Sequence, residues 1–150
     1  MKSAITILIL VFSSLVGVHG QQNNIIPNSS FEEFSGVPLG WFYSGSQFTR
    51  LVKYWNSPTL ASPDAFGPGI VVPKHWQKKG FGLVQPFDKG AMAGITVFGC
   101  ADGKPHCREY LHIQLSESLV EGQEYELSYY LSHLDGSLFI DRIGVVFTDE

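Results

Sequence analysis

The sequence predicts an all-β domain built from antiparallel strands, and two observations carry this prediction. Three stretches in the last third of the chain, residues 109–115, 125–134 and 143–147, place apolar side chains at every second position. Neighbouring side chains of a strand point to opposite faces, so this period of two is typical of a sheet with one buried face. The 16 glycines, 8 prolines and 13% aromatic residues also suit short strands joined by turns.

Length and charge narrow the class further. The chain has 150 residues, which is enough for one domain, and its hydrophobic content of 44% is enough for a core. Its formal net charge is −4 and it contains no basic tract. A nucleic-acid partner requires a positive surface, so we expect none.

The first 20 residues have the features of a cleaved signal peptide. Lys2 supplies a positive charge, residues 4–18 are largely apolar, and small or β-branched side chains flank His19 ahead of Gln21. The alternative is a membrane anchor, but the apolar stretch is shorter than the roughly 20 residues that span a bilayer. We therefore expect export, with residues 21–150 forming the mature domain and containing no transmembrane helix.

The first half of the mature chain is expected to consist mainly of turns and loops. A turn is predicted at residues 27–30, before Phe31. Residues 35–73 are rich in glycine, proline, serine and asparagine, and their X-Pro steps argue against helix. One short strand is predicted at residues 48–52.

The second half is expected to supply the sheet. A strand is predicted at residues 91–98, followed by the three alternating stretches, with turns at residues 121–123 and 135–136. A sandwich usually needs about seven or eight strands, more than the sequence supplies. We therefore expect the chain to be the N-terminal part of a longer protein.

Residues 28–33, with the sequence NSSFEE, resemble the opening of galactose-binding-like jelly rolls and related carbohydrate-binding modules. The mature chain as a whole is similar to the N-terminal domain of exported proteins from Bacteroidetes-type bacteria. The matching segments occur in the family's order at residues 55–59, 62–66, 72–73, 93–95, 108–111, 125–132 and 141–147.

The resemblance implies a galactose-binding-like, antiparallel jelly-roll β-sandwich, truncated at its C-terminal end. Family members close with a strand carrying paired aspartates, which is missing here. In related modules the opening glutamate and the closing aspartate help to hold a structural calcium ion, and Glu32 matches the opening residue. The resemblance therefore implies calcium in the complete protein and no other cofactor. It also implies an outer-membrane, cell-surface or extracellular location, ahead of an outer-membrane-protein-A-like domain or a secretion-sorting tail.

Cys100 and Cys107 flank a short segment that contains glycine and proline. In an oxidising compartment two cysteines this close in sequence favour a disulfide. Free thiols and a metal site with His106 are the alternatives. The metal site is the weakest of the three, because the adjacent side chains of His106 and Cys107 make poor joint ligands.

Catalytic motifs are missing from the sequence. Glu32 and Glu33 are sequence neighbours, and neighbours in a strand point to opposite faces, so they do not form an acid/base pair across a sugar. Neither H-E-x-x-H nor G-x-S-x-G occurs. We therefore expect no enzyme activity, with a hydrolase domain as a weaker alternative.

Aromatic residues in the loops are the best candidates for ligand binding. Tyr54, Trp55 and Trp76 lie in segments predicted as loops or strand edges, where aromatic rings either stack on sugars or fill the core. Asp64, between two small apolar residues, is the most plausible polar partner. We expect a non-catalytic module that recognises glycan or cell-envelope material through these residues. The alternative is a structural or adhesive domain of an outer-membrane-associated protein with protein partners.

Overall fold

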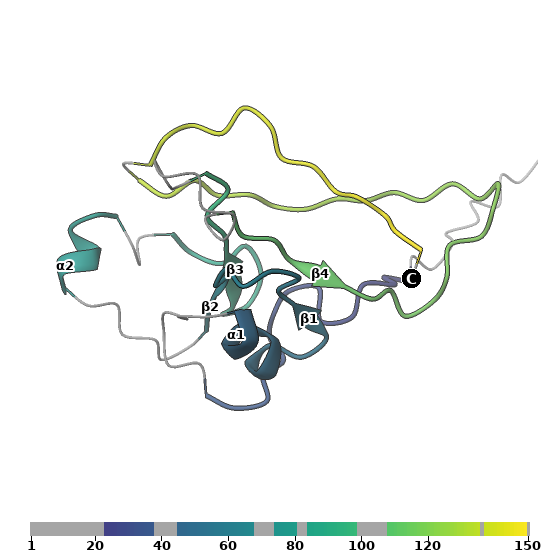
Figure 1. Ribbon diagram of the computed structural model, residues 1–150, viewed down its shortest axis with the longest axis horizontal. Coiled ribbons are helices and arrows are strands. Elements are labelled where there is room, and N and C mark those ends of the chain that lie inside the picture. The colour runs from purple at the N-terminus through teal and green to yellow at the C-terminus, as the bar shows by residue number, and fades with distance from the viewer. Residues whose placement is uncertain are drawn as a thin grey trace, which may run out of the picture.

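In the computed structural model, residues 23–37, 45–67, 74–80, 84–98, 108–135 and 137–149 are described. Their elements, in chain order, are α1 (Gly45–Leu51), β1 (Trp55–Asn56), β2 (Asp64–Phe66), α2 (Lys74–Gln77), β3 (Met92–Gly94) and β4 (His112–Ile113) (Figure 1). The strands form two small antiparallel sheets, one of β1 and β4 and one of β2 and β3. The fold is therefore mostly β with little helix, as predicted at that level.

Both sheets join segments that are distant in sequence. In the first sheet, Trp55 pairs with Ile113. In the second, Ala65 pairs with Ala93. The predicted strand at residues 91–98 is thus confirmed in its first half, as β3, and the one at residues 109–115 at its centre, as β4; both observed strands are shorter than predicted.

The predicted strand at residues 48–52 is wrong, because helix α1 occupies these residues. Phe48 and Val52 are both fully buried. Side chains four residues apart lie on the same face of a helix, so this pair directs one face of α1 into the core. The X-Pro steps at Pro58, Pro63 and Pro68 lie after α1, and the sequence of the helix itself, GSQFTRL, contains no proline.

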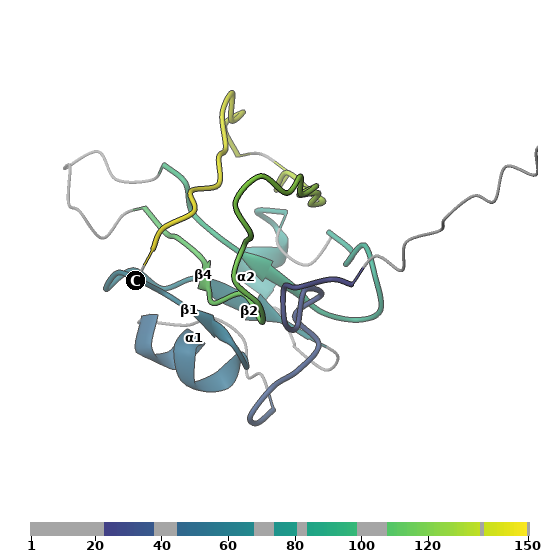
Figure 2. The same ribbon diagram turned by 90° about the vertical axis from the view of Figure 1, so that its right-hand side faces the viewer.

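Helix α1 packs beneath β1, as both ribbon views show (Figures 1 and 2). At its first residue, Gly45, a side chain would have its Cβ 2.6 Å from the carbonyl oxygen of Thr59 and 2.7 Å from that of Ala61. A glycine is therefore required where the helix meets this loop. The buried centre consists of Phe48, Val52 and Ala65, and the partly buried hydrophobic residues packed against it are Phe31, Phe34, Trp55, Ala93 and Leu111.

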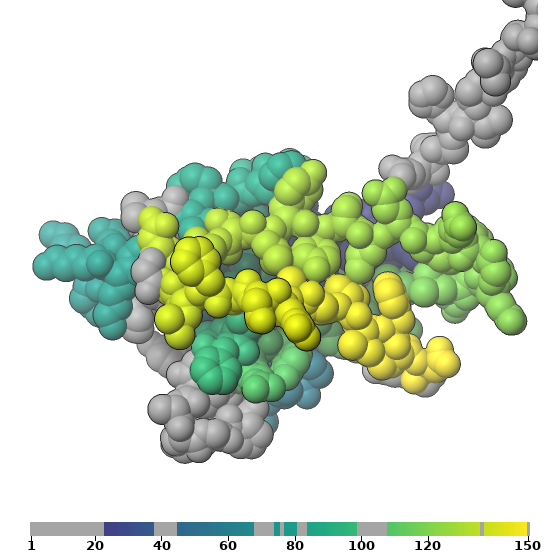
Figure 3. All heavy atoms as spheres, turned by 90° about the horizontal axis from the view of Figure 1, so that it is seen from above, coloured from purple at the N-terminus to yellow at the C-terminus, as the bar shows by residue number. Residues whose placement is uncertain are grey.

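Residues 119–149 form what we call the open hairpin. Its two extended arms, residues 123–134 and 138–149, run along the top of the molecule and meet at a turn in which Ser137 N donates to Leu134 O at 3.0 Å (Figures 1 and 3). The predicted paired strands at residues 125–134 and 143–147 are not found: the described residues of both arms contain no strand. Alternation correctly predicted the extended backbone but not its pairing.

The tip of the open hairpin touches the segment that follows α2. Gly80, at a φ of +90°, is buried, and a Cβ there would lie 2.6 Å from the carbonyl oxygen of Asp135. Phe87 stacks on Tyr130 of the first arm. The structure contains no helix, within its described ranges, of the length and hydrophobicity needed to cross a membrane.

Candidate functional site

The opening turn is held by the side chain of Asn28. Its Nδ2 donates to the carbonyl oxygens of Glu33, at 3.1 Å, and Lys53, at 3.0 Å. Its Oδ1 accepts from the backbone N of Glu33 at 2.9 Å. These three hydrogen bonds, which we call the Asn28 clasp, tie the start of the domain to the residues just before β1.

Trp55 is seated on the same turn. Its indole Nε1 donates to the backbone oxygen of Asn28 at 2.9 Å. Its ring lies 4.7 Å from that of Phe31, centroid to centroid, with the planes tilted by 33°. Trp55 is half-buried and packs on the core. Of the two roles foreseen for the loop aromatics, these contacts make packing the main one for Trp55.

Tyr54 differs from its neighbour in being exposed. Its relative exposure is 56%, and its backbone adopts a φ of +72°. It stands between Lys53, which the Asn28 clasp holds, and Trp55, which is anchored on Asn28. The ring is therefore presented to solvent from a backbone fixed on both sides.

The left-handed backbone of Tyr54 is part of a local group. Asn28, at a φ of 47°, and Phe31, at 62°, belong to the turn that holds it. Positive φ is tolerated by asparagine but is unusual for aromatic residues, and such conformations concentrate where function requires a fixed geometry. This cluster makes the turn and Tyr54 the best candidate site among the described residues.

Charged groups lie beside the aromatic ones. Lys53 Nζ is 3.8 Å from Glu33 Oε2, and both side chains are about half exposed. An exposed pair of this kind contributes at most about 1 kcal/mol to stability. Lys53 directly precedes Tyr54 in the sequence, and this ion pair links Lys53 to the opening turn. Asp64 lies elsewhere, in β2, where it is half-buried and pairs with Gly94.

The carboxylate of Glu32 anchors the segment that leads into β3. Its Oε1 accepts from the backbone N of Gly90, at 2.9 Å, and of Ala91, at 2.7 Å. Two N–H donors on one oxygen oppose a cation at that oxygen, and Glu33 pairs with Lys53 instead of joining it. The described part of the chain contains no group of three or more potential metal ligands. Within the described residues Glu32 therefore acts as a structural anchor for the segment before β3, and calcium in the complete protein stays a prediction.

Glu109 has a structural role through a contact that the sequence does not mark. Its Oε2 accepts from Thr96 N at 2.6 Å, and its own backbone N donates to Thr96 O at 2.9 Å. Burial raises the pKa of the Glu109 carboxyl above its usual 4.5, and hydrogen bonds from Thr96 and Ser62 partly offset this rise. No motif in the sequence marks such a contact, because it joins two loops.

Three groups of predicted residues lie outside the described part of the chain. These are the signal peptide at residues 1–20, the cysteines Cys100 and Cys107, and the side chain of Trp76, whose backbone belongs to α2. The signal, the disulfide and the role of Trp76 therefore stay predictions.

Comparison of the chain with protein-family models found no match. No curated protein and no solved structure matched it either. Function is therefore inferred from the geometry of Tyr54 and of the residues that hold it.

Proposed function

We propose that the chain is a non-catalytic, exported binding module that recognises glycan or cell-envelope material. The jelly-roll architecture of galactose-binding-like domains is part of this proposal, and the mostly-β fold is compatible with it. The observation that carries the proposal is the exposed ring of Tyr54 on a backbone held in a left-handed conformation.

The support for a sugar ligand is physical. An exposed aromatic face stacks on the apolar C–H face of a sugar, and the hydroxyls of that sugar need polar groups near its rim. In this proposal such groups come from Lys53, the neighbour of Tyr54 in the chain, and from its ion-pair partner Glu33. Because the clasp already fixes the backbone, little conformational entropy is lost on binding. In this proposal Tyr54 contacts the ligand, while Trp55 supports it from the core side.

A glycan array probed with the purified chain tests this proposal. We expect binding to at least one glycan class, and loss of that binding in Tyr54→Ala. Tyr110→Ala is the matched control, because Tyr110 has a similar exposure of 47% but lies outside the candidate site. Trp76→Ala tests the second predicted aromatic in the same experiment.

Two results would contradict the proposal. One is the lack of binding to any glycan or to isolated cell-envelope material. The other is equal loss of binding in Tyr54→Ala and Tyr110→Ala, which would mean that neither ring is the specific contact. Circular dichroism of each variant shows whether the fold is retained.

A structural or adhesive role with protein partners is the second candidate. The observation that favours it is the apolar surface of the open hairpin, where Phe139 is 95% exposed and Val146 is 84% exposed. A glycan-binding role gives no reason for this surface. The two roles are compatible, because the hairpin and the Asn28 clasp involve different residues.

A further inference from the structure

The open hairpin exposes more apolar surface than an isolated domain usually does. Fourteen large hydrophobic side chains between Leu119 and Phe147 are at least 37% exposed, Phe139 and Leu138 most of all among those near its tip. Together they present on the order of 1000 Å² of side-chain surface. These side chains are spread over two arms, and their summed area is comparable with the about 800 Å² that each partner of a stable interface covers. The surface is therefore large enough for a specific interface.

Few backbone groups of the hairpin are hydrogen-bonded to other described residues. Within its described residues, the only backbone–backbone hydrogen bonds are two turn contacts, Gln123 N to Val120 O and Ser137 N to Leu134 O. Extended backbone with unpaired N–H and C=O groups is a template for another strand. A lipid surface does not satisfy such groups, whereas a polypeptide strand does.

The hairpin lacks the two strongest protections of a free edge. Natural edge strands that face solvent are protected by charged side chains, lysine above all, or by proline. Residues 119–149 contain neither lysine nor proline, and their charged side chains are acidic except for Arg142. Such an edge repels a second acidic strand but not a basic one.

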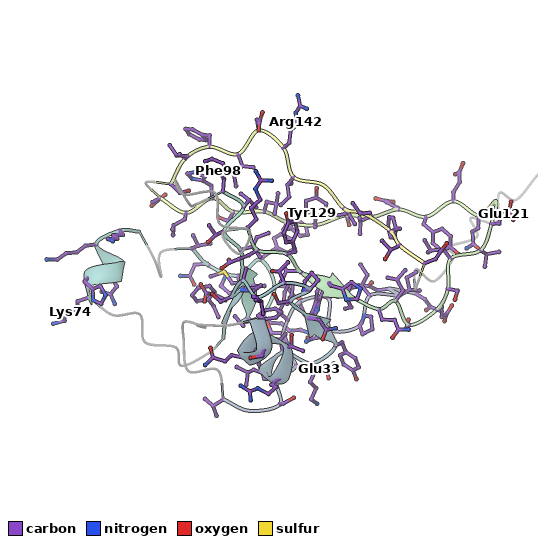
Figure 4. All side chains as sticks on the ribbon, viewed as in Figure 1. Glu33, Lys74, Phe98, Glu121, Tyr129 and Arg142 are labelled. Carbon is purple, nitrogen blue, oxygen red and sulfur yellow. The ribbon has the colours of Figure 1, made fainter. Side chains whose placement is uncertain are left out.

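The charge of the hairpin indicates what covers it. Residues 119–149 contain six acidic residues and one arginine, which gives a formal charge of −5. Arg142 stands on the second arm, well away from Glu121 at the far bend, so it does not offset the charge there (Figure 4). Pairing with the hairpin of a second copy would place acid against acid. A strand with basic side chains is complementary instead.

We propose that the open hairpin docks an extended segment of another polypeptide, with apolar side chains at alternate positions and lysine or arginine between them. Main-chain hydrogen bonds to the arms provide the pairing, the apolar row covers residues such as Leu131 and Val146, and the basic row faces Glu124 and Glu126. The face seen from above in Figure 3, formed by the two arms, is the docking surface. This proposal is independent of the glycan proposal.

Synthetic peptides test the proposal directly on the purified chain. The probe alternates valine and lysine, and the controls are a valine–glutamate peptide and a peptide of the probe's composition with helical spacing. We expect only the probe to bind in fluorescence anisotropy. Hydrogen exchange should then slow at the amides of residues 125–131 and 143–147, and not in α1.

A matched pair of variants localises the binding. Val146→Lys introduces a lysine on an arm of the hairpin, at a side chain that is 84% exposed. Val37→Lys introduces a lysine outside the hairpin, at a side chain that is 74% exposed. We expect roughly tenfold weaker binding of the probe to Val146→Lys and no change for Val37→Lys. Both valines are exposed, so neither change disturbs the core.

Four outcomes would overturn the proposal. Equal binding of the probe and either control peptide would indicate unspecific adhesion. A dimer in sedimentation, with the arm amides protected, would identify a second copy as the occupant. Protected arm amides in the free monomer would mean that the arms are already paired. Binding to neutral lipid vesicles with no binding to the probe would identify a membrane surface.

Discussion

Asn28 is the residue on which the candidate site depends most. Its side chain holds Glu33 and Lys53, and its backbone oxygen receives the indole N–H of Trp55. Asparagine suits this position for two reasons: it tolerates a left-handed backbone, and its amide both donates and accepts hydrogen bonds. One residue therefore fixes the positions on both sides of Tyr54.

Removing the carboxylate of Glu32 should destabilise the domain. We expect calcium to have no effect on the stability of the wild-type chain. Glu32→Ala leaves the amides of Gly90 and Ala91 without their acceptor, and we expect a loss of about 1.5–3 kcal/mol in the free energy of unfolding. Urea denaturation measures this loss. Glu33→Ala is the control, because its exposed ion pair with Lys53 contributes at most about 1 kcal/mol.

The same measurements with calcium and with a chelator separate an anchor from a metal ligand. We expect the two curves to coincide for the wild-type chain. A gain in stability on adding calcium that disappears in Glu32→Ala would show that Glu32 binds the ion after all.

Glu109 makes stability depend on pH in a defined direction. Its pKa is raised in the folded state, so the protonated form favours folding, and that contribution is complete below the unfolded value near 4.5. It is lost as the pH rises through the raised pKa. We therefore expect the wild type to lose stability relative to Glu109→Gln as the pH rises from below 4.5 through the raised pKa.

Thermal or urea unfolding of the two proteins across this range gives the comparison. The glutamine keeps an acceptor oxygen for Thr96 and does not titrate, which isolates the effect of the charge. A relative gain in wild-type stability with rising pH would mean that the hydrogen bonds from Thr96 and Ser62 outweigh burial.

At the scale of elements, the alternating pattern correctly predicted a strand where a partner strand exists within the chain. Residues 109–115 form β4 at their centre, and Leu111 and Ile113 are half-buried while Tyr110 and Gln114 are exposed. Helix α1 was missed because its seven residues are too few to show a helical period, and its burial depends on Phe48 and Val52 meeting distant strands. Tertiary contacts therefore determine the secondary structure of this segment, which its local sequence pattern does not.

The contact between Gly80 and Asp135 gives a testable prediction at the scale of elements, because it joins the segment after α2 to the tip of the open hairpin. In Gly80→Ala the new Cβ would meet the carbonyl of Asp135 at 2.6 Å, and the backbone φ of +90° is itself unfavourable for alanine. We expect a loss of roughly 2–3 kcal/mol in the free energy of unfolding.

Gly122→Ala is the matched control for this change. Gly122 also has a positive φ, of 78°, but a Cβ added there would have nothing within 4 Å of it. Alanine there should cost only about 1 kcal/mol, from the backbone alone. Equal losses at both glycines would show that the hairpin tip does not press on Gly80 in solution.

At the scale of the whole molecule, the sequence predicted the class of fold and part of the candidate site. Tyr54 and Trp55 do lie together at the opening turn, as their adjacency requires, but Asp64 belongs to the other sheet. The Asn28 clasp could not be predicted from the sequence, because a side chain joins Asn28 to a residue 25 positions away. The pattern of apolar residues did mark the arms of the hairpin, yet periodicity does not reveal which partner covers a row of side chains.

The whole molecule thus presents two surfaces of different character. One is a small, rigid aromatic point at Tyr54, and the other is the long apolar and acidic face of the open hairpin. Glycan and peptide probes address them separately, and Tyr54→Ala and Val146→Lys should each affect one kind of binding and leave the other unchanged. Loss of both activities in either variant would point to a change in the fold.

The close approach at Gly45 also provides a criterion for identifying homologues of this protein. A chain with the same framework must keep glycine there, because the loop oxygens of Thr59 and Ala61 fill the space that any larger residue would need. Together with Asn28 and Trp55, it forms a three-point signature set by backbone geometry, not by overall likeness. A search for these three residues at this spacing would help to identify homologues whose other positions have diverged.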